Sequence, residues 1–430
     1  MLVTIAHPKP SEWDTILQRP VVDATVLFDR VRNIMQEVKA GGDVAIRKYT
    51  LDLDGVELDS IAVSPEMIVT AKNEVSLALQ HAIHSAAQNI RTFHSTQLKE
   101  EIPIETMEGV SCWRKLLPIE KVGLYIPGGT APLFSSILML GIPAQLAGCK
   151  EIILCTPPGK DGKIHPAMLV AAAEVGIKKI FTVGGVQAIA AMTYGTETIP
   201  SVYKIFGPGN QYVTAAKQLA QLAGIAIDMP AGPSEVCVWA DATANPEWVA
   251  ADLLSQAEHG ADSQVLLVTT DAALPEKVRV ALEQQLKELP RNEMARKALN
   301  NSRAIVVDTA DEALALVNDY APEHLIIACA EPELLAPGIV NAGSVFLGHF
   351  TPESVGDYAS GTNHTLPTNG FARAFSGVSV DSFVKKVTFQ QLSSVGLTSL
   401  APIVTEMAMA EGLQGHARAV SIRLENHQPK

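Results

Sequence analysis

The pattern of apolar positions changes near residue 122. Before it, apolar residues recur at helical spacing, most clearly over residues 71–97, so we expect residues 1–120 to be mostly helical. After it come short continuous apolar runs that end in glycine-containing turns, at residues 122–126, 151–155, 179–183 and 204–206. Alanine- and leucine-rich helical stretches separate these runs, for example at residues 167–175 and 186–194. Strand, glycine turn and helix in repetition predict a parallel sheet with crossover helices, its strands buried on both faces.

A second block repeats this order further along the chain. It predicts strands at residues 235–240, 264–269, 304–307 and 325–328, and helices at residues 246–258 and 275–289. Residues 401–424 have a helical pattern and are expected to form a small terminal domain. The fold class is therefore α/β.

Composition narrows the class of protein. A chain of 430 residues suggests roughly three domains, and 47% hydrophobic with 18% charged residues is typical of a packed globular protein. The formal net charge is −13, without a run of lysine and arginine, which argues against nucleic acid as a partner. An anionic cofactor would therefore have to be held by hydrogen-bond donors close to it, and not by the overall charge of the protein.

Nothing in the sequence directs the chain to a membrane. Residues 1–8 lack the basic and long apolar regions of a signal peptide. The longest apolar stretch, residues 133–149, is interrupted by Ser135, Ser136, Pro143 and Gln145 and is a poor membrane span. The five cysteines are scattered and form no CxxC pair, so we expect reduced thiols in a cytoplasmic protein.

The glycine turns are the first candidate binding feature. No GxGxxG fingerprint, P-loop or HExxH motif occurs. Turns at Gly128-Gly129, Gly184-Gly185 and residues 207–210 would still place bare N–H groups at helix N-termini, where a pyrophosphate can bind. Ordinary turn packing in an α/β protein explains them equally well.

Three segments carry candidate polar chemistry. Gln256 and His259 share a helix face and could ligate a metal, or they could simply end a helix at Gly260. Glu323 and His324 precede a strand and could divide general-base work, or could lie in a solvated loop.

Residues 352–364 lack periodicity, which is typical of a functional loop or of a plain surface loop. They offer Asp357 as a ligand and His364 as a substrate contact. Glu411 and His416 lie in the terminal helical stretch, where an exposed helix face explains them as well, and His349 receives no role.

Taken together, these segments resemble the histidinol dehydrogenase family along essentially the whole chain. The resemblance rests on residues 125–129, 183–188, 206–210, 228–235, 254–260, 321–325 and 352–364. It implies one Zn²⁺ per subunit, with ligands Gln256, His259, Asp357 and His416, and a general-base pair, Glu323 and His324. It implies cofactor contacts at Tyr125, Gln187 and Asn210. The implied substrate contacts are Ser234, His364 and Glu411 together with Gln256, His259, His324, Asp357 and His416.

The resemblance also implies an architecture. It is two Rossmann-like domains with parallel sheets and incomplete dinucleotide-binding character, plus small helical terminal segments. The expected boundaries are a helical segment at 1–21, a first α/β domain at 22–124 with 235–378, a cofactor-side domain at 125–234, and a helical C-terminal domain at 379–430. The family is a homodimer, so Glu411 and His416 are expected to complete the partner subunit's site.

The implied reaction converts L-histidinol to L-histidine through a bound aldehyde, in two hydride transfers to NAD. Zinc anchors the substrate, His324 takes protons, and Glu323 activates water. No cysteine matches a nucleophile. The alternatives are a zinc hydrolase, a catalytically silent relative that binds a small ligand or partner, and a dehydrogenase that oxidises another amino alcohol. Reduction of NAD in the presence of histidinol separates the hydrolase from the dehydrogenase.

Overall fold

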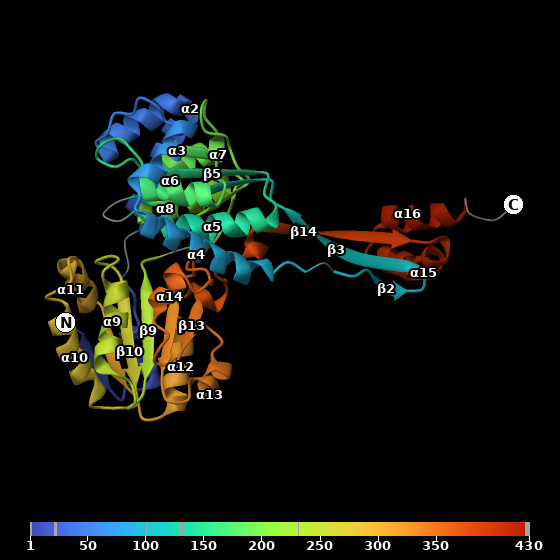
Figure 1. Cartoon of the computed structure of the whole chain (residues 1–430). Coiled ribbons are helices and arrows are strands. Elements are labelled where there is room, and N and C mark those ends of the chain that lie inside the picture. Colours follow the sequence, from blue (N-terminus) through green and yellow to red (C-terminus); the bar gives the residue numbers. More distant parts are fainter. Residues whose placement is uncertain (1, 21–23, 100, 129–131, 231, 426–430) are drawn as a thin grey trace. The chain divides into compact units, whose positions relative to one another are not determined.

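The computed structural model describes residues 2–20, 24–99, 101–128, 132–230 and 232–425 (Figure 1). Contacts divide the chain into two compact units. Unit 1 comprises Met1–Gln97 and Ile119–Phe383, and unit 2 comprises Leu98–Pro118 and Val384–Lys430. The predicted α/β class is confirmed, because unit 1 contains a five-stranded and a six-stranded sheet in which all paired strands are parallel.

The five-stranded sheet has the order β6-β5-β4-β7-β8. Its strands are β4 (Lys121–Tyr125), β5 (Glu151–Thr156), β6 (Lys179–Thr182), β7 (Lys204–Phe206) and the unexpected short β8 (Ala226–Ile227). The crossover helices are α5 (Phe134–Ala147), α6 (Pro166–Glu174), α7 (Gly185–Tyr194) and α8 (Gln211–Leu222). The apolar runs were good strand signals because these strands are covered on both faces.

Residues 24–95 pack on this same sheet. They form α2 (Ala24–Asp54), α3 (Pro65–Glu74) and α4 (Leu77–Ser95), which contact α7, α6 and α5 respectively. Apolar residues of α2, including Val31 and Met35, share one core with Ile189 of α7. The structure thus differs from the expected grouping of 22–124 with 235–378, and the expected boundary at residue 125 falls within β4.

The six-stranded sheet has the order β1-β11-β10-β9-β12-β13. Its strands are β1 (Val3–Ala6), β9 (Glu235–Ala240), β10 (Gln264–Thr269), β11 (Arg303–Val306), β12 (His324–Ala328) and β13 (Ser344–Leu347). The helices around it are α9 (Pro246–Ala257), α10 (Leu274–Gln285), α11 (Asn292–Asn300), α12 (Ala310–Tyr320), α13 (Pro332–Leu335) and α14 (Glu353–Tyr358). The four strands predicted in this block are confirmed.

The N-terminal segment is not purely helical, as had been expected for residues 1–21. Strand β1 adds to the edge of the six-stranded sheet by pairing with β11, and only then do η1 (Pro10–Glu12) and α1 (Trp13–Ile16) follow. The remaining 3-10 helices are η2 (Ala336–Gly338), η3 (Phe371–Arg373) and η4 (Val380–Phe383).

Unit 2 is built from two distant chain segments. An antiparallel sheet of order β14-β3-β2 contains β2 (Ile104–Met107), β3 (Val110–Pro118) and β14 (Val384–Leu392), followed by α15 (Ser394–Ala410) and α16 (Gln414–Glu425). The prediction of helix up to residue 120 and of an all-helical segment 379–430 is therefore wrong at these strands. Each segment supplies the backbone partner that the other needs.

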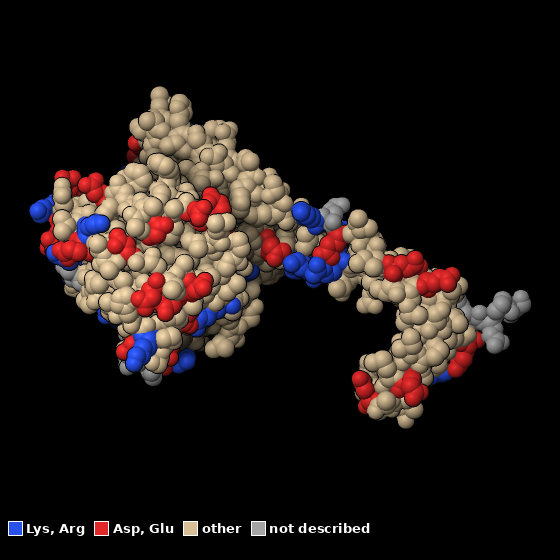
Figure 2. Space-filling model, turned by 90° about the horizontal axis from the view of Figure 1, so that it is seen from below, with Lys and Arg blue, Asp and Glu red and all other residues tan. Residues whose placement is uncertain are grey.

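Within the described ranges no helix is long and apolar enough to cross a membrane. The five cysteines are free. On the face in Figure 2, acidic side chains are spread over unit 1 and basic side chains occur among them in small groups.

Candidate active site between two sheet edges

A cavity of about 580 Å³ lies within unit 1, where the carboxyl ends of one parallel sheet and the amino ends of the other both contribute to its wall. On one side it is lined by Pro127, two residues after the last residue of β4, and by Gly207, which directly follows β7. On the other side it is lined by Ser234, which precedes β9, and by His324, which begins β12. The carboxyl edge of one sheet therefore faces the amino edge of the other.

Glu323 and His324 are buried in the wall of this cavity, so the solvated-loop alternative does not hold. Helix α12 ends at Tyr320, Ala321 turns the chain with a φ of 51°, and β12 begins two residues after Pro322. The backbone N–H of Glu235 donates to Glu323 Oε2 (2.8 Å), and His324 Nδ1 donates to the backbone carbonyl of Glu235 (3.1 Å). His324 Nε2 is thereby left as the nitrogen available for chemistry.

Burial and mutual proximity shift the pKa of both groups. Burial raises the pKa of Glu323 to about 8, although His324 opposes the shift. Burial alone would lower the pKa of His324, but the carboxylates of Glu323 (3.7 Å from Nδ1) and Asp357 (3.3 Å from Nε2) raise it to about 10. Both shifts favour the protonated forms.

Gln256, His259 and Asp357 line the same cavity. Gln256 lies in the last turn of α9 and His259 directly follows that helix. Asp357 lies in α14, which corrects the expectation that residues 352–364 lack regular structure; six residues are too few to show a periodicity. Desolvation of the imidazole lowers the pKa of His259 although the residue keeps an exposed part, and the Asp357 carboxylate opposes this shift. The lowered pKa favours the neutral imidazole that binds metals.

Glu353 is a functional candidate that the sequence reasoning missed. Its buried carboxylate accepts hydrogen bonds from Gln256 Nε2 and from Ser255 Oγ (2.6 Å). With its amide nitrogen engaged, Gln256 keeps its carbonyl oxygen as the possible ligand atom. The signal was available, since Glu353 lies four residues before Asp357 and so on the same helix face.

The predicted zinc ligands suit the metal chemically, and three of the four line one cavity. Oxygen and imidazole donors match a borderline divalent cation, and Asp357 Oδ1 is a buried atom without a hydrogen bond. Among the described residues, however, no group of three or more His, Cys, Asp or Glu side chains could hold a metal ion. One predicted ligand is an amide, and His416 belongs to unit 2.

Glu411 and His416 lie at the end of α15 and in the first turn of α16, and both are exposed on unit 2. Their roles stay predictions. The predicted substrate contacts in unit 1, Ser234 and His364, both line the cavity. His364 Nδ1 donates to the Asp357 carbonyl (2.8 Å), and its Nε2 lies 3.0 Å from Ser136 Oγ.

The predicted cofactor residues separate into two groups. Asn210 lines the cavity and caps α8 by accepting from Tyr212 N (3.0 Å) and Val213 N (3.2 Å). Tyr125 and Gln187 are buried and do not line the described cavity wall. The Tyr125 hydroxyl instead accepts from Gly185 N (3.2 Å), and Gln187 Nε2 donates to Asp54 (3.5 Å).

The glycine turns show close packing. A Cβ on Gly207, whose φ is 128°, would lie 1.9 Å from the Tyr125 carbonyl oxygen, and one on Gly184 would lie 2.4 Å from Pro157. Turn packing thus accounts for glycine at these two positions, whatever else binds there. Gly129 and Ala231, which belong to two of the motifs, lie outside the described residues.

Comparison with known proteins gives a consistent result. The family model described as "Histidinol dehydrogenase" matches residues 17–424. A histidinol dehydrogenase of Bacteroides fragilis is 59% identical over 421 residues, covering 98% of both chains, and one of Bacteroides thetaiotaomicron is 57% identical over 424 residues, covering 99% of both. The crystal structure of histidinol dehydrogenase from Elizabethkingia anophelis superposes with a TM-score of 0.96 at 56% identity, covering 99% of this chain and 98% of that one.

Asp252→Asn is expected to stabilise the fold near pH 8 and to change little near pH 4. Burial and repulsion from Glu353 raise the pKa of Asp252 from 3.8 to about 7. The folded state therefore holds this proton more tightly than the unfolded state, and wild-type stability falls as pH rises through this window. Urea unfolding at both pH values measures the difference. Glu247→Gln, an exposed carboxylate on the same helix, is the control; an equal effect of Asp252→Asn at both pH values contradicts the assignment.

Proposed function

The chain belongs to the histidinol dehydrogenase family, and we propose that it oxidises L-histidinol to L-histidine with two NAD as hydride acceptors, the last step of histidine biosynthesis. The observation that carries the proposal is the burial of Glu323 and His324 side by side in one cavity wall, facing the space that Gln256, His259 and Asp357 also line. The cavity thus holds both a pair of titratable groups that can exchange protons with a substrate and polar groups that can anchor it.

Zinc fits this site as a proposed cofactor. Gln256, His259 and Asp357 would hold it with His416 of the partner subunit, and the buried Asp357 Oδ1, which accepts no hydrogen bond, supports this choice. When bound, zinc would anchor the amino and imidazole nitrogens of the substrate without changing its oxidation state. Once the charge of Asp357 is neutralised, one of the three carboxylates that raise the pKa of His324 no longer acts, and the ring can serve as a base.

His324 acts in the first half of the proposed reaction. Because its Nδ1 proton is committed to the Glu235 carbonyl, Nε2 accepts the alcohol proton while the first hydride leaves the substrate carbon for NAD. The resulting aldehyde stays in the cavity. Ser234 and His364 contact the substrate there and Asn210 contacts the cofactor; the cofactor roles of the buried Tyr125 and Gln187 stay predictions.

Glu323 acts in the second half. Its carboxylate accepts a proton from the water that attacks the aldehyde carbon, giving a hydrate. His324, after giving up its first proton to solvent, takes a hydroxyl proton of the hydrate as the second hydride leaves for the second NAD, and the carboxylate product forms with two NADH and three protons released in all. The balance is one alcohol, one water and two NAD consumed. No cysteine occurs in the described cavity lining, so the route needs no thiohemiacetal.

A homodimer with shared sites completes the proposal. Unit 2 exposes apolar side chains that a second copy could cover, including Ile102 (83% exposed), Ile104 (67%) and Met407 (61%). Glu411 and His416 lie in the same unit. In the proposed dimer, Glu411 contacts the partner's substrate and His416 completes the partner's zinc site.

The purified protein is expected to form two NADH for each L-histidinol consumed. Chelator dialysis should abolish this activity and added zinc should restore it, because the substrate loses its anchor. Absorbance of NADH and metal analysis measure both. Consumption of an ester or amide substrate with no NADH formed would favour the zinc-hydrolase alternative.

His324→Asn is expected to lower kcat for alcohol oxidation by about 10²–10⁴-fold, since the general base is lost. Zinc content should be unchanged, because the proposed ligands remain. Steady-state kinetics and metal analysis test the variant together. Near-wild-type turnover would contradict the role given to His324.

Glu323→Gln is expected to spare the first hydride transfer more than the second. The amide cannot accept the proton of the attacking water, so aldehyde oxidation should lose more than alcohol oxidation. A single-turnover burst of NADH from histidinol, compared with turnover of added aldehyde, separates the steps. Equal loss in both assays would count against water activation.

Coexpression of His324→Asn with His416→Ala is expected to recover about one quarter of wild-type activity in the unfractionated mixture and about one half in the isolated mixed dimer, although each variant alone is inactive. In a mixed dimer with shared sites, one of the two sites contains only wild-type residues. Purification with two different tags isolates the mixed species. If His416 served its own chain, the mixture would stay inactive.

A further inference from the structure

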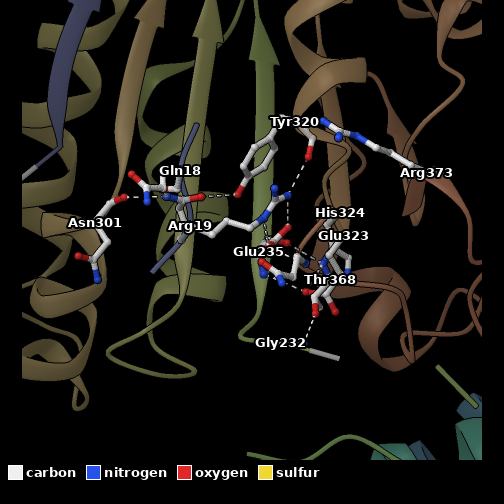
Figure 3. A network of polar contacts seen from close by, with 12 residues as sticks. Gln18, Arg19, Gly232, Glu235, Asn301, Tyr320, Glu323, His324, Thr368 and Arg373 are labelled. Atoms are coloured by element: carbon white, nitrogen blue, oxygen red, sulfur yellow. Dashed lines mark hydrogen bonds and ion pairs between the residues drawn. The ribbon is translucent and has the colours of Figure 1, made fainter. Parts of the chain in front are cut away.

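One residue of the N-terminal segment reaches the framework that holds the base pair. Arg19 follows α1 and forms a two-point ion pair with the buried carboxylate of Glu235, with Nε–Oε1 at 2.6 Å and Nη2–Oε2 at 2.9 Å. The same Nη2 donates to the Tyr320 carbonyl (2.7 Å), and the guanidinium lies 4.1 Å from the centre of the Tyr320 ring. Figure 3 shows Arg19 between Tyr320 and Glu235.

Glu235 in turn holds both members of the base pair through its backbone. Its N–H fixes Glu323 Oε2, and its carbonyl fixes Nδ1 of His324. One residue therefore determines where the Glu323 carboxylate points and which His324 nitrogen is free. A displacement of this residue would move both groups at once.

Arg19 also holds the loop that carries Glu323. Tyr320 is the last residue of α12, and Ala321 after it adopts the left-handed conformation that few non-glycine residues take. By binding the Tyr320 carbonyl and the Glu235 carboxylate together, Arg19 joins the end of α12 to the start of β9. The Glu235 carboxylate also accepts from Asn369 N (2.8 Å), in a segment that lines the cavity.

Further hydrogen bonds connect Tyr320 to the six-stranded sheet and to the residue before Arg19. The Tyr320 hydroxyl donates to Oε1 of Gln264 (2.9 Å). The Nε2 of Gln264 in turn donates to the carbonyls of Gln18 and Asn301 (both 3.0 Å). The residue before Arg19 is thus tied to the same sheet. Arg19 does not line the main cavity but lines a second one of about 270 Å³.

We infer that Arg19 is a positioning residue, which acts through Glu235 to hold Glu323 and His324 in their working orientations. The inference rests on the proposed function. The N-terminal segment then contributes to turnover through Arg19, in addition to supplying the edge strand β1 of the six-stranded sheet. Because Arg19 touches neither substrate nor metal in this scheme, its loss should affect kcat rather than substrate binding.

Arg19→Lys is the first test, because it keeps the buried positive charge but cannot make the two-point pair. We expect kcat with histidinol to fall about 10- to 100-fold, while KM changes by less than about threefold and zinc content stays at the wild-type level. Arg19→Ala should lose more, and methylguanidinium, which can enter through the second cavity, should restore part of its kcat.

Arg373 provides the matched control. It lines the same second cavity and pairs with Asp319 (Nη2–Oδ1 3.1 Å), and none of its described contacts is with Glu235. Arg373→Lys and Arg373→Ala should keep wild-type kcat and show no response to methylguanidinium. Thermal unfolding of all four variants separates loss of stability from loss of turnover.

The outcomes distinguish this inference from the proposed function. Wild-type kcat in Arg19→Lys, or joint loss of zinc and of substrate binding in that variant, overturns the positioning role. Loss of kcat alone, with rescue of Arg19→Ala, supports it. If the wild-type protein itself forms no NADH from histidinol, the proposed function fails; if it does and Arg19→Lys matches it, only the inference about Arg19 fails.

Discussion

Parallel pairing of β9 with β12 is the interaction on which the candidate site depends. The register places His324 opposite Val236, so that Glu323 and His324 start their strand beside Glu235. Both backbone groups of Glu235 are then used to hold catalytic candidates. Ligands of α/β proteins usually bind at the carboxyl ends of strands. Here the six-stranded sheet contributes its amino edge, while the five-stranded sheet contributes its carboxyl edge, so each sheet supplies a different kind of group to one cavity.

The electrostatics of the cavity follow from this crowding. Glu323, Asp357 and Glu353 gather around a single histidine, His324, and burial raises the pKa of Glu353 to about 7 while it raises that of Glu323 further. Asp357 behaves oppositely: burial would raise its pKa, but its contact with His324 holds it well below its usual value. An arrangement with more buried carboxylates than buried cations is best stabilised by an added positive charge, which is the physical reason for placing a divalent cation beside Asp357.

The sequence predicted the parallel strands of unit 1 well, because continuous apolar runs such as residues 235–240 and 264–269 are buried on both faces. It failed at β2, β3 and β14, whose partially exposed residues alternate weakly and whose partner strands lie far apart in the chain. The zinc and base residues came from family resemblance, not from periodicity. Arg19 gave no local signal, since its contact with Glu235 spans 216 positions. The visible sign in the sequence was Glu235 itself, a glutamate at the start of an otherwise apolar strand, which needs a buried partner.

Unit 2 is assembled from two segments that lie far apart in the chain, and this constrains the order in which the protein can fold during synthesis. Strand β3 emerges from the ribosome early, whereas its neighbour β14 follows only after both sheets of unit 1 have been synthesised. At translation rates of roughly 5–20 residues per second, Val110–Pro118 must wait for its partner with open backbone groups, next to the exposed Ile102 and Ile104. Unit 2 is therefore the last part of the subunit to mature, and nascent chains that stall before residue 384 would carry a strand paired with β2 on one edge only, with its other edge open to chaperones or to aggregation.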